Sequence, residues 1–152
     1  MEVAMSNVSN LLDSKGHDVL TVKPEQPLHD VVDLMCTRSA GTALVMDEGE
    51  VKGILSERDV FRKVVLPRLC VEDVTVGDIM SKTLTTVSPD TSLDECMQIM
   101  TDKRIRHLPV LRDKQLCGIV SIGDVVKYLL LEKDFKIRNL ETYIAGSQES
   151  VC

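Results

Sequence analysis

Apolar positions along the chain follow a pattern that occurs twice. One helix face is predicted by the i, i+3, i+4, i+7 spacing of Leu28, Val31, Val32 and Met35. The same spacing recurs in Leu93, Cys96, Met97 and Met100, so the second set follows the first by 65 positions (93 − 28). A constant long spacing without insertions predicts one structural unit used twice. Each unit is too small to bury a good core alone, so the two are expected to lie against each other.

Short apolar runs on either side of these helices predict strands. Residues 19–22 read as a strand that ends before Pro24 and Pro27. Two further strands follow each helix as a hairpin, at 42–46 and 51–55 and again at 108–111 and 116–120. A second helix then begins at Glu57 or Ile122 and runs to about Leu66 or Leu131. The predicted fold is α+β, with two β-α-β-β-α repeats, here residues 8–70 and 74–135.

Two helices are expected outside the repeats. Val8, Leu11 and Leu12 form an apolar stripe ahead of Gly16, and this helix is expected to lie across the first repeat. In the tail, 136–152, apolar residues at helical spacing predict an amphipathic helix from Lys136 to Gly146, docked on the repeats or on a partner. The last six residues are expected to be disordered. Ser92 and Glu95 predict a capping box at the start of the second-repeat helix.

Composition narrows the function classes. The net charge of −6 disfavours a nucleic-acid binder, which needs a basic surface. No apolar run approaches the roughly 20 residues that span a bilayer, so no membrane role is expected and the predicted location is the cytoplasm. The five cysteines are odd in number and none has C-x-x-C spacing, which disfavours disulfides and a zinc site. Cys96 belongs to the apolar helix stripe and is interpreted as a core residue.

A seven-residue stretch at the end of each hairpin carries the candidate chemistry. It runs from Gly53 to Asp59 and again from Gly118 to Asp124, and each copy has the order glycine, two apolar residues, serine, two variable residues, aspartate. The first free N–H groups of the following helix favour an anion, and the aspartate can accept hydrogen bonds from the two hydroxyls of a ribose. Ser-x-x-Asp is also an ordinary capping box, and that alternative stays open.

Cationic residues gather near the first of these stretches. An arginine at a helix start opposes the helix dipole unless an anion compensates, so Arg58, together with Arg106, is hypothesised to contact phosphates. Lys63, Lys103 and Arg104 are interpreted as a solvated face. The run from Arg106 to Val110 contains Pro109, which confines it to a strand start or a sheet edge, where backbone groups can hold a flat base. No residue near His107 has the context of a nucleophile that it would activate.

These motifs resemble the CBS domain, and the pair resembles a tandem CBS (Bateman) module over roughly residues 8 to 135. The resemblance rests on Val76-Gly77-Asp78-Ile79-Met80, Arg106-His107-Leu108-Pro109-Val110 and the two stretches ending in Asp59 and Asp124. It implies repeats related by a pseudo-twofold axis, clefts for AMP, ATP, NAD or S-adenosylmethionine, and a homodimer. Both copies have serine where the family more often has threonine, and the first lacks the Arg-His-Leu-Pro run, so its slot is expected to bind differently or stay empty.

By this resemblance the two aspartates hold ribose hydroxyls, the two serines lie near phosphate, and Leu20-Thr21 and Thr83-Leu84 line adenine slots. The full set of candidate ligand-binding residues is Leu20, Thr21, Thr42, Ser56, Arg58, Asp59, Thr83, Leu84, Arg106, His107, Leu108, Pro109, Ser121, Ile122 and Asp124. No catalytic or metal-binding set is predicted.

The function indicated is a regulatory sensor of an adenine nucleotide that acts through a conformational change, on an effector protein or through the dimer. It has no catalytic cofactor. Three alternatives remain: a dimerisation scaffold with empty clefts, a detached regulatory part of a nucleotide-pathway enzyme, and redox signalling through Cys36 or Cys117.

Overall fold

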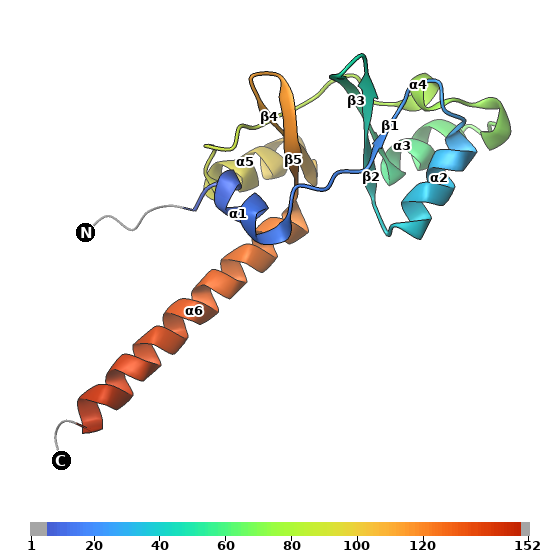
Figure 1. The fold of residues 1–152 in the computed structure, drawn as a ribbon. Coiled ribbons are helices and arrows are strands. Elements are labelled where there is room, and N and C mark those ends of the chain that lie inside the picture. Colours follow the sequence, from blue (N-terminus) through green and yellow to red (C-terminus); the bar gives the residue numbers. More distant parts are fainter. Residues whose placement is uncertain (1–5, 150–152) are drawn as a thin grey trace.

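The computed structural model describes residues 6–149 as two lobes, with one long helix extending from the second (Figure 1). The first lobe holds β1 (Thr21–Val22), α2 (Leu28–Thr37), β2 (Thr42–Asp47), β3 (Glu50–Ser56) and the short helix α3 (Glu57–Val60), which continues as the π-helical turn η1 (Phe61–Val65). Its sheet has the order β1-β2-β3, with β1 parallel and β3 antiparallel to β2.

The second lobe repeats this arrangement with α5 (Leu93–Lys103), β4 (His107–Arg112), β5 (Gln115–Ser121) and α6 (Ile122–Glu149). The hairpins share their register, because Thr42 pairs with Ser56 as His107 pairs with Ser121. The predicted first strand is reduced here to a single parallel bridge between Val87 and Val110. The α+β class and the two repeats predicted from the sequence are therefore confirmed.

The helix stripes are buried as their spacing predicts. In α5, Leu93, Cys96 and Met100 face the core of the second repeat, and Cys96 is completely buried. The Ser92 hydroxyl accepts a hydrogen bond from the Glu95 N–H at 3.1 Å, which is the serine half of the predicted capping box. Among the described residues the reverse bond from Glu95 does not form.

Helix α1 (Val8–Lys15) lies on the second repeat, and the prediction that it crosses the first is wrong. Its Val8, Leu11 and Leu12 belong to the core of the second repeat. The Val8 N–H donates to the Thr91 carbonyl at 2.9 Å and the Ser9 N–H donates to the Pro89 carbonyl at 2.8 Å. An amphipathic stripe shows that a face is buried, but it does not show what covers it.

The connection between the repeats makes the reciprocal contact. It contains η2 (Val71–Asp73) and α4 (Val76–Ile79), and Val76 and Ile79 complete the core of the first repeat. The Gly77 N–H donates to the Pro24 carbonyl at 2.8 Å, as Ser9 does to Pro89 in the other repeat. Helix α1 precedes the first repeat and completes the second, whereas α4 precedes the second repeat and completes the first. Ser9 and Gly77 are equivalent residues of these two segments and are 68 positions apart (77 − 9).

The glycine of each repeated stretch lies at one of these contacts. A Cβ on Gly53 would come within 2.8 Å of the Ser81 carbonyl oxygen and of the Met80 sulfur. A Cβ on Gly118 would come within 2.9 Å of the Leu12 side chain. Gly53 therefore leaves room for residues 80–81 of the connection between the repeats, and Gly118 leaves room for α1.

Helix α6 is continuous, and the prediction of a separate tail helix from Lys136 is wrong. It runs without a break from Ile122 to Glu149, past the predicted end at Gly146. The helix leaves the module (Figure 1), and every residue from Lys133 to Ala145 is exposed, so this part is not docked on the repeats. The predicted disorder of the last six residues does not hold for 147–149, and 150–152 lie outside the described residues.

Candidate functional site

A cleft of about 590 Å³ lies between the two repeats. One wall is the end of β3 and the start of α3, and the other is formed by residues 81–85 and the start of β4. Nine of the predicted residues line it: Thr42, Ser56, Arg58, Asp59, Thr83, Leu84, Arg106, His107 and Pro109. The structure thus brings parts of both repeats, far apart in sequence, into one concave site.

Six predicted residues are not part of the cleft lining: Leu20, Thr21, Leu108, Ser121, Ile122 and Asp124. Leu108 is completely buried in the core of the second repeat. The side chains of a strand alternate between its faces, and in β4 His107 and Pro109 therefore reach the cleft while Leu108 does not.

Asp59 is the buried acid of the site, with 9% of its surface exposed. Its Oδ2 accepts hydrogen bonds from the Ser56 N–H and the Ser56 hydroxyl, each at 3.0 Å. Its Oδ1 accepts one from the Ser81 hydroxyl at 3.1 Å and lies 3.4 Å from the Lys63 ammonium. The Asp59 N–H donates to the Ser56 hydroxyl oxygen, so the capping box forms, and the same residue lines the cleft.

Asp124 makes the same cap in the second repeat but has a different outer partner. Its Oδ2 accepts a hydrogen bond from the Ser121 N–H at 3.0 Å and forms a 2.6 Å ion pair with Lys15 of α1. Burial raises the pKa of Asp124, but hydrogen bonds from Lys15 and Ser121 lower it more, and the pKa lies below the ordinary 3.8. The second box is thus closed by a cation from the chain itself.

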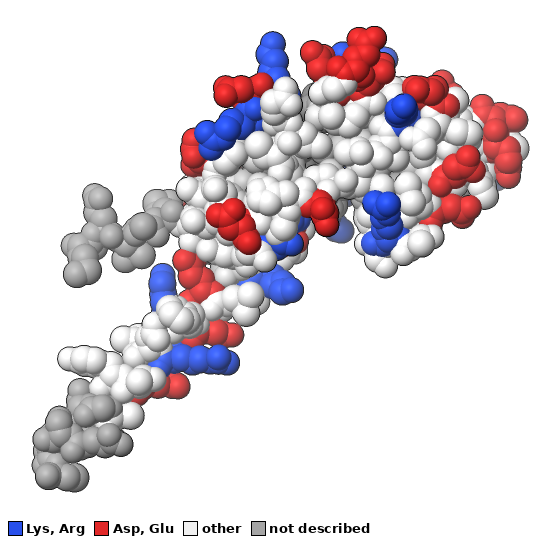
Figure 2. All heavy atoms as spheres, in the orientation of Figure 1, with Lys and Arg blue, Asp and Glu red and all other residues white. Residues whose placement is uncertain are grey.

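Four arginines line the cleft: Arg58, Arg62, Arg104 and Arg106. The acidic residues lining it are Glu57 and Asp59, although the whole chain carries a net charge of −6. Acidic side chains instead cover much of the outer surface of the first repeat (Figure 2). The cleft is therefore a local concentration of positive charge on an acidic protein.

Two residues interpreted as a solvated face belong to this site. Arg104 lines the cleft, and Lys63 bonds the Asp59 carboxylate and donates to the Ile79 carbonyl at 2.8 Å. Lys63 lies four residues after Asp59 on the same helical segment, a spacing that could have revealed the pair. Ser81 was missed because it comes from the connection between the repeats, which no periodic pattern ties to the first box.

His107 lies half-buried where the cleft meets the second repeat. Burial lowers the pKa of His107 below its ordinary 6.5, and the nearby Lys15 and Arg106 act in the same direction against Asp124 and Glu57. The imidazole is therefore neutral at neutral pH. It can gain a proton when an anion enters the cleft.

Other chemistry is sparse in the described part of the chain. Burial raises the pKa of Cys96 to about 11, so its thiol stays protonated, as the core interpretation requires. Residues 6–149 contain no group of three or more His, Cys, Asp or Glu side chains placed to hold a metal ion. None of the described helices combines the length and the apolar character needed to cross a membrane. The cytoplasmic location stays a prediction.

Comparison with known proteins agrees with the repeat structure. The CBS domain family model matches residues 8–66 and 76–131. The chain is 37% identical over 150 residues to the mitochondrial CBS domain-containing protein CBSX3 of Arabidopsis thaliana, covering 93% of this chain and 73% of that protein.

Solved structures show the same fold. A putative signal-transduction protein with CBS domains from Burkholderia ambifaria has a TM-score of 0.80 and 39% identity, over 83% of this chain and 95% of that one. A CBS-domain containing protein from Agrobacterium tumefaciens has a TM-score of 0.77 and 36% identity, over 81% and 98%. The chain therefore belongs to the CBS domain family and carries two CBS repeats.

Proposed function

We propose that the chain is a regulatory module that binds one adenosine-containing nucleotide, of the AMP, ATP or NAD type, in the cleft beside Asp59. The observation that carries this proposal is the cleft itself, where four arginines and one buried carboxylate surround about 590 Å³ in an acidic protein. Arginines are suited to phosphate, and a cleft of this volume suits a nucleotide. The module acts by binding and not by catalysis.

The cleft offers a place for each part of such a ligand. Arg58 and Arg106, which approach from the two repeats, bind phosphate oxygens. The apolar side of the cleft, with Ile54, Leu84 and Pro109, takes the flat base. Asp59 holds the ribose hydroxyls, which support charge-assisted hydrogen bonds to its carboxylate.

Asp59 must exchange a partner to bind ribose. The four contacts to its oxygens already use the lone-pair directions of a carboxylate. The Oδ2 bonds fix the helix start, whereas the Oδ1 bonds to Ser81 and Lys63 come from side chains that can turn away. A ribose hydroxyl therefore replaces the Ser81 hydroxyl or the Lys63 ammonium at Oδ1.

One ligand per chain follows from the lining of the cleft, because Ser121, Ile122 and Asp124 are not part of it. Asp124 is also paired with Lys15 at 2.6 Å, a shorter distance than the 3.4 Å between Asp59 and Lys63, and no second ligand is proposed there. Because the Asp59 cleft is lined by both repeats, the ligand favours the relative arrangement of the repeats in which both walls reach it. That shift is the signal passed to an effector protein.

The test is a thermal-shift screen with AMP, ADP, ATP, NAD, NADH and S-adenosylmethionine on the wild type, Asp59→Ala and Asp124→Ala. A ligand at 100 times its dissociation constant adds about 2.7 kcal/mol of stability to the wild type. Both variants lose a helix cap and melt earlier without ligand, so the readout is the ligand-induced shift. We expect the shift to survive in Asp124→Ala and to disappear in Asp59→Ala.

Two results would reject the proposal. Wild-type protein that none of the six compounds stabilises would leave a dimerisation scaffold as the better account. A shift that is unchanged in Asp59→Ala but lost in Asp124→Ala would place the ligand in the other repeat.

A further inference from the structure

The four arginines that line the cleft have no acidic partner. Among residues 6–149 none of them takes part in an ion pair, although the chain contains 24 acidic residues. Of the two acids in the lining, Asp59 is already paired with Lys63. The carboxyl group of Glu57 lies beside Gly41, where an added Cβ would be 3.9 Å from it and 3.9 Å from the His107 ring. The cleft therefore holds like charges that favour the entry of an anion.

The fold does not need arginines at these positions. The residues of the other repeat that are equivalent to Arg58, Arg62, Arg104 and Arg106, at the constant offset of 65, are Gly123, Lys127, Ser39 and Gly41. Three of these four equivalents carry no charge, yet the same elements form around them. Arg104 has a left-handed backbone with a φ of 55°, and Ser39 has the same conformation with a φ of 52°. This conformation is uncommon for a residue with a long side chain, and such residues cluster at ligand sites.

One phosphate group is too small for all four arginines. Arg58 and Arg62 are four residues apart on the continuous segment of α3 and η1, where side chains at this spacing are neighbours. Arg104 and Arg106 lie on the opposite wall, and Arg58 Nη1 donates to the Arg104 carbonyl at 3.5 Å across the cleft. A terminal phosphate has three acceptor oxygens, and arginine commonly engages two at once. A second phosphate is needed to give every arginine a partner.

The charges of the cleft lead to the same result. Asp59 is balanced by Lys63, and Glu57 counts against one of the four arginines, which leaves about three positive charges (4 − 1). A terminal phosphate carries about −1.5 to −2 charge at pH 7. A phosphate that is linked on both sides adds about one negative charge. A diphosphate therefore matches the cleft, whereas a monophosphate leaves about one positive charge unmatched.

We propose that Arg62 and Arg104 form a subsite for a second phosphate, so that the cleft prefers a nucleoside diphosphate to a nucleoside monophosphate. This inference rests on the proposed function and narrows its ligand. Arg58 and Arg106 hold the phosphate next to the ribose, and Arg62 and Arg104 bind the terminal one. A terminal phosphate carries more charge than either linked phosphate of a dinucleotide, so ADP is favoured over NAD as well.

The test is calorimetric titration of the full-length protein with AMP, ADP and NAD. The buffer contains no divalent cation, because a bound cation would neutralise the second phosphate. We expect ADP to bind the wild type at least about tenfold more tightly than AMP, since each arginine adds a charge-assisted hydrogen bond. NAD is expected to bind at least about threefold more weakly than ADP.

The test variant is Arg62→Gln with Arg104→Ser. Serine is the residue that the first repeat has in the same left-handed conformation, so this change keeps a backbone that the fold already uses. We expect the affinity for ADP to fall at least about tenfold and the affinity for AMP to fall less than about threefold. The remaining AMP binding shows that the cleft of the variant is folded.

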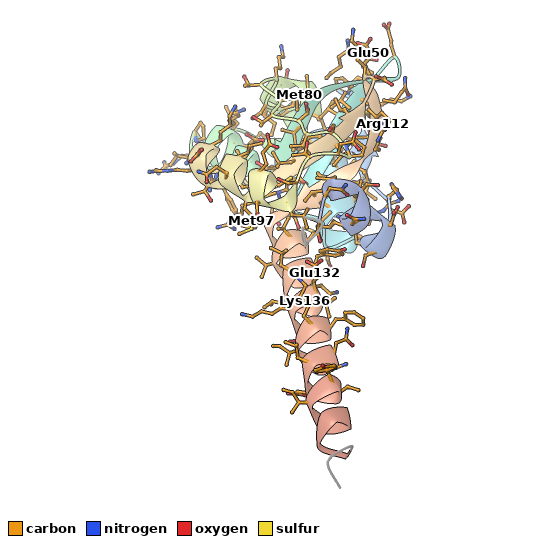
Figure 3. All side chains as sticks on the ribbon, turned by 90° about the vertical axis from the view of Figure 1, so that its left-hand side faces the viewer. Glu50, Met80, Met97, Arg112, Glu132 and Lys136 are labelled. Carbon is orange, nitrogen blue, oxygen red and sulfur yellow. The ribbon has the colours of Figure 1, made fainter. Side chains whose placement is uncertain are left out.

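Two comparisons separate the subsite from a general effect of charge. Arg112→Ala with Lys136→Ala also removes two cations, and neither residue lines the cleft. Figure 3 shows Arg112 on the hairpin of the second repeat and Lys136 on the free part of α6. This control is expected to keep the preference for ADP. Arg58→Ala with Arg106→Ala is expected to weaken AMP and ADP by similar factors.

The possible failures are distinguishable. If ADP binds the wild type no more tightly than AMP, or if the Arg62 and Arg104 variant loses affinity for both equally, the subsite is wrong and the proposed function stands. NAD that binds as tightly as ADP would overturn the choice of a terminal phosphate. If none of the three compounds binds, the subsite and the proposed function are both wrong.

Discussion

The two CBS repeats carry the same capped helix start and use it differently. In both, the serine and aspartate of the box exchange hydrogen bonds with each other's backbone N–H groups, at 3.0 to 3.2 Å. Asp59 then faces a cleft lined by four arginines, whereas Asp124 is held by Lys15. The cap is a local property of the box, but access to the carboxylate is decided elsewhere in the chain.

The difference lies in the segments that the repeats exchange. Lys15 is the last residue of α1. The equivalent residue of the connection between the repeats, 68 positions later, is Thr83, which lines the cleft beside Asp59. A long cationic side chain reaches the carboxylate of the second repeat. A short hydroxyl side chain at the related position leaves room in the first. The comparison shows that a repeated motif does not imply a repeated site.

The largest expected effect comes from removing the phosphate contacts of the open cleft. Arg58→Ala with Arg106→Ala removes two charge-assisted hydrogen-bond donors, worth about 1.5–3 kcal/mol each. Nucleotide affinity measured by calorimetry is expected to fall at least about 100-fold, since 1.4 kcal/mol is a factor of ten.

The matched control for that double variant is Arg112→Ala. Arg112 lies at the end of β4, pairs with Asp90 and does not line the cleft. Its affinity is expected to equal that of the wild type. Unchanged affinity in the double variant would show that the cleft arginines do not bind the ligand.

The ion pair between Lys15 and Asp124 is expected to contribute to the stability of the protein. Lys15→Met removes the ion pair that holds the pKa of Asp124 below 3.8 and is expected to lower the free energy of unfolding at pH 7 by about 1 kcal/mol. A depressed acid pKa contributes stability above the unfolded-state pKa, and that stability is lost as pH falls through the folded-state pKa. The difference between variant and wild type is thus expected to shrink below about pH 4 in urea titrations.

Lys52→Met is the control for this experiment, because Lys52 pairs with Glu50 on the exposed first hairpin. It is expected to leave unfolding unchanged at every pH. A Lys15→Met difference that persists at pH 2.5 would assign the loss to packing of the lysine stem and not to its charge.

Local patterns predicted the repeated elements because each depends on spacing within one segment. The helix stripe at Leu93, Cys96 and Met100 is an example, since its three- and four-residue spacing alone fixes which side is buried. The continuity of α6 was also readable, because residues 131–136 contain neither proline nor glycine to end a helix. No helix breaker therefore supported the predicted separation of a helix ending at about Leu131 from a tail helix beginning at Lys136.

The arrangement of the segments was not predictable in the same way. Nothing local shows that α1 covers the second repeat, or that Lys15 meets Asp124 at a separation of 109 residues. On the sequence alone, the candidate residues were assigned to two clefts. In the structure nine of them lie in one cleft, because both repeats contribute to it. These are long-range contacts, and a single sequence carries no direct signal of them.

The smallest expected effect is a pH dependence of binding at the open cleft. Burial holds the pKa of His107 below 6.5 in the free protein, and a phosphate bound by the adjacent Arg106 would raise it. A group whose pKa rises on binding takes up a proton, so affinity increases as pH falls through that range. Between pH 7.5 and 6.0, the AMP affinity of the wild type is expected to rise relative to that of His107→Asn, and a pKa rise of about half a unit sets an upper limit of about threefold on this difference. His107→Asn should lack the contribution of the histidine, while the Arg58 contact keeps its binding measurable. In NMR spectra, the His107 ring signals should move on titration with AMP. Those of His29, which lies exposed on α2, should stay in place. Because the second proton of the AMP phosphate titrates in the same range, the comparison of the two proteins is decisive: the same pH dependence in the wild type and in His107→Asn would mean that His107 does not face the bound phosphate.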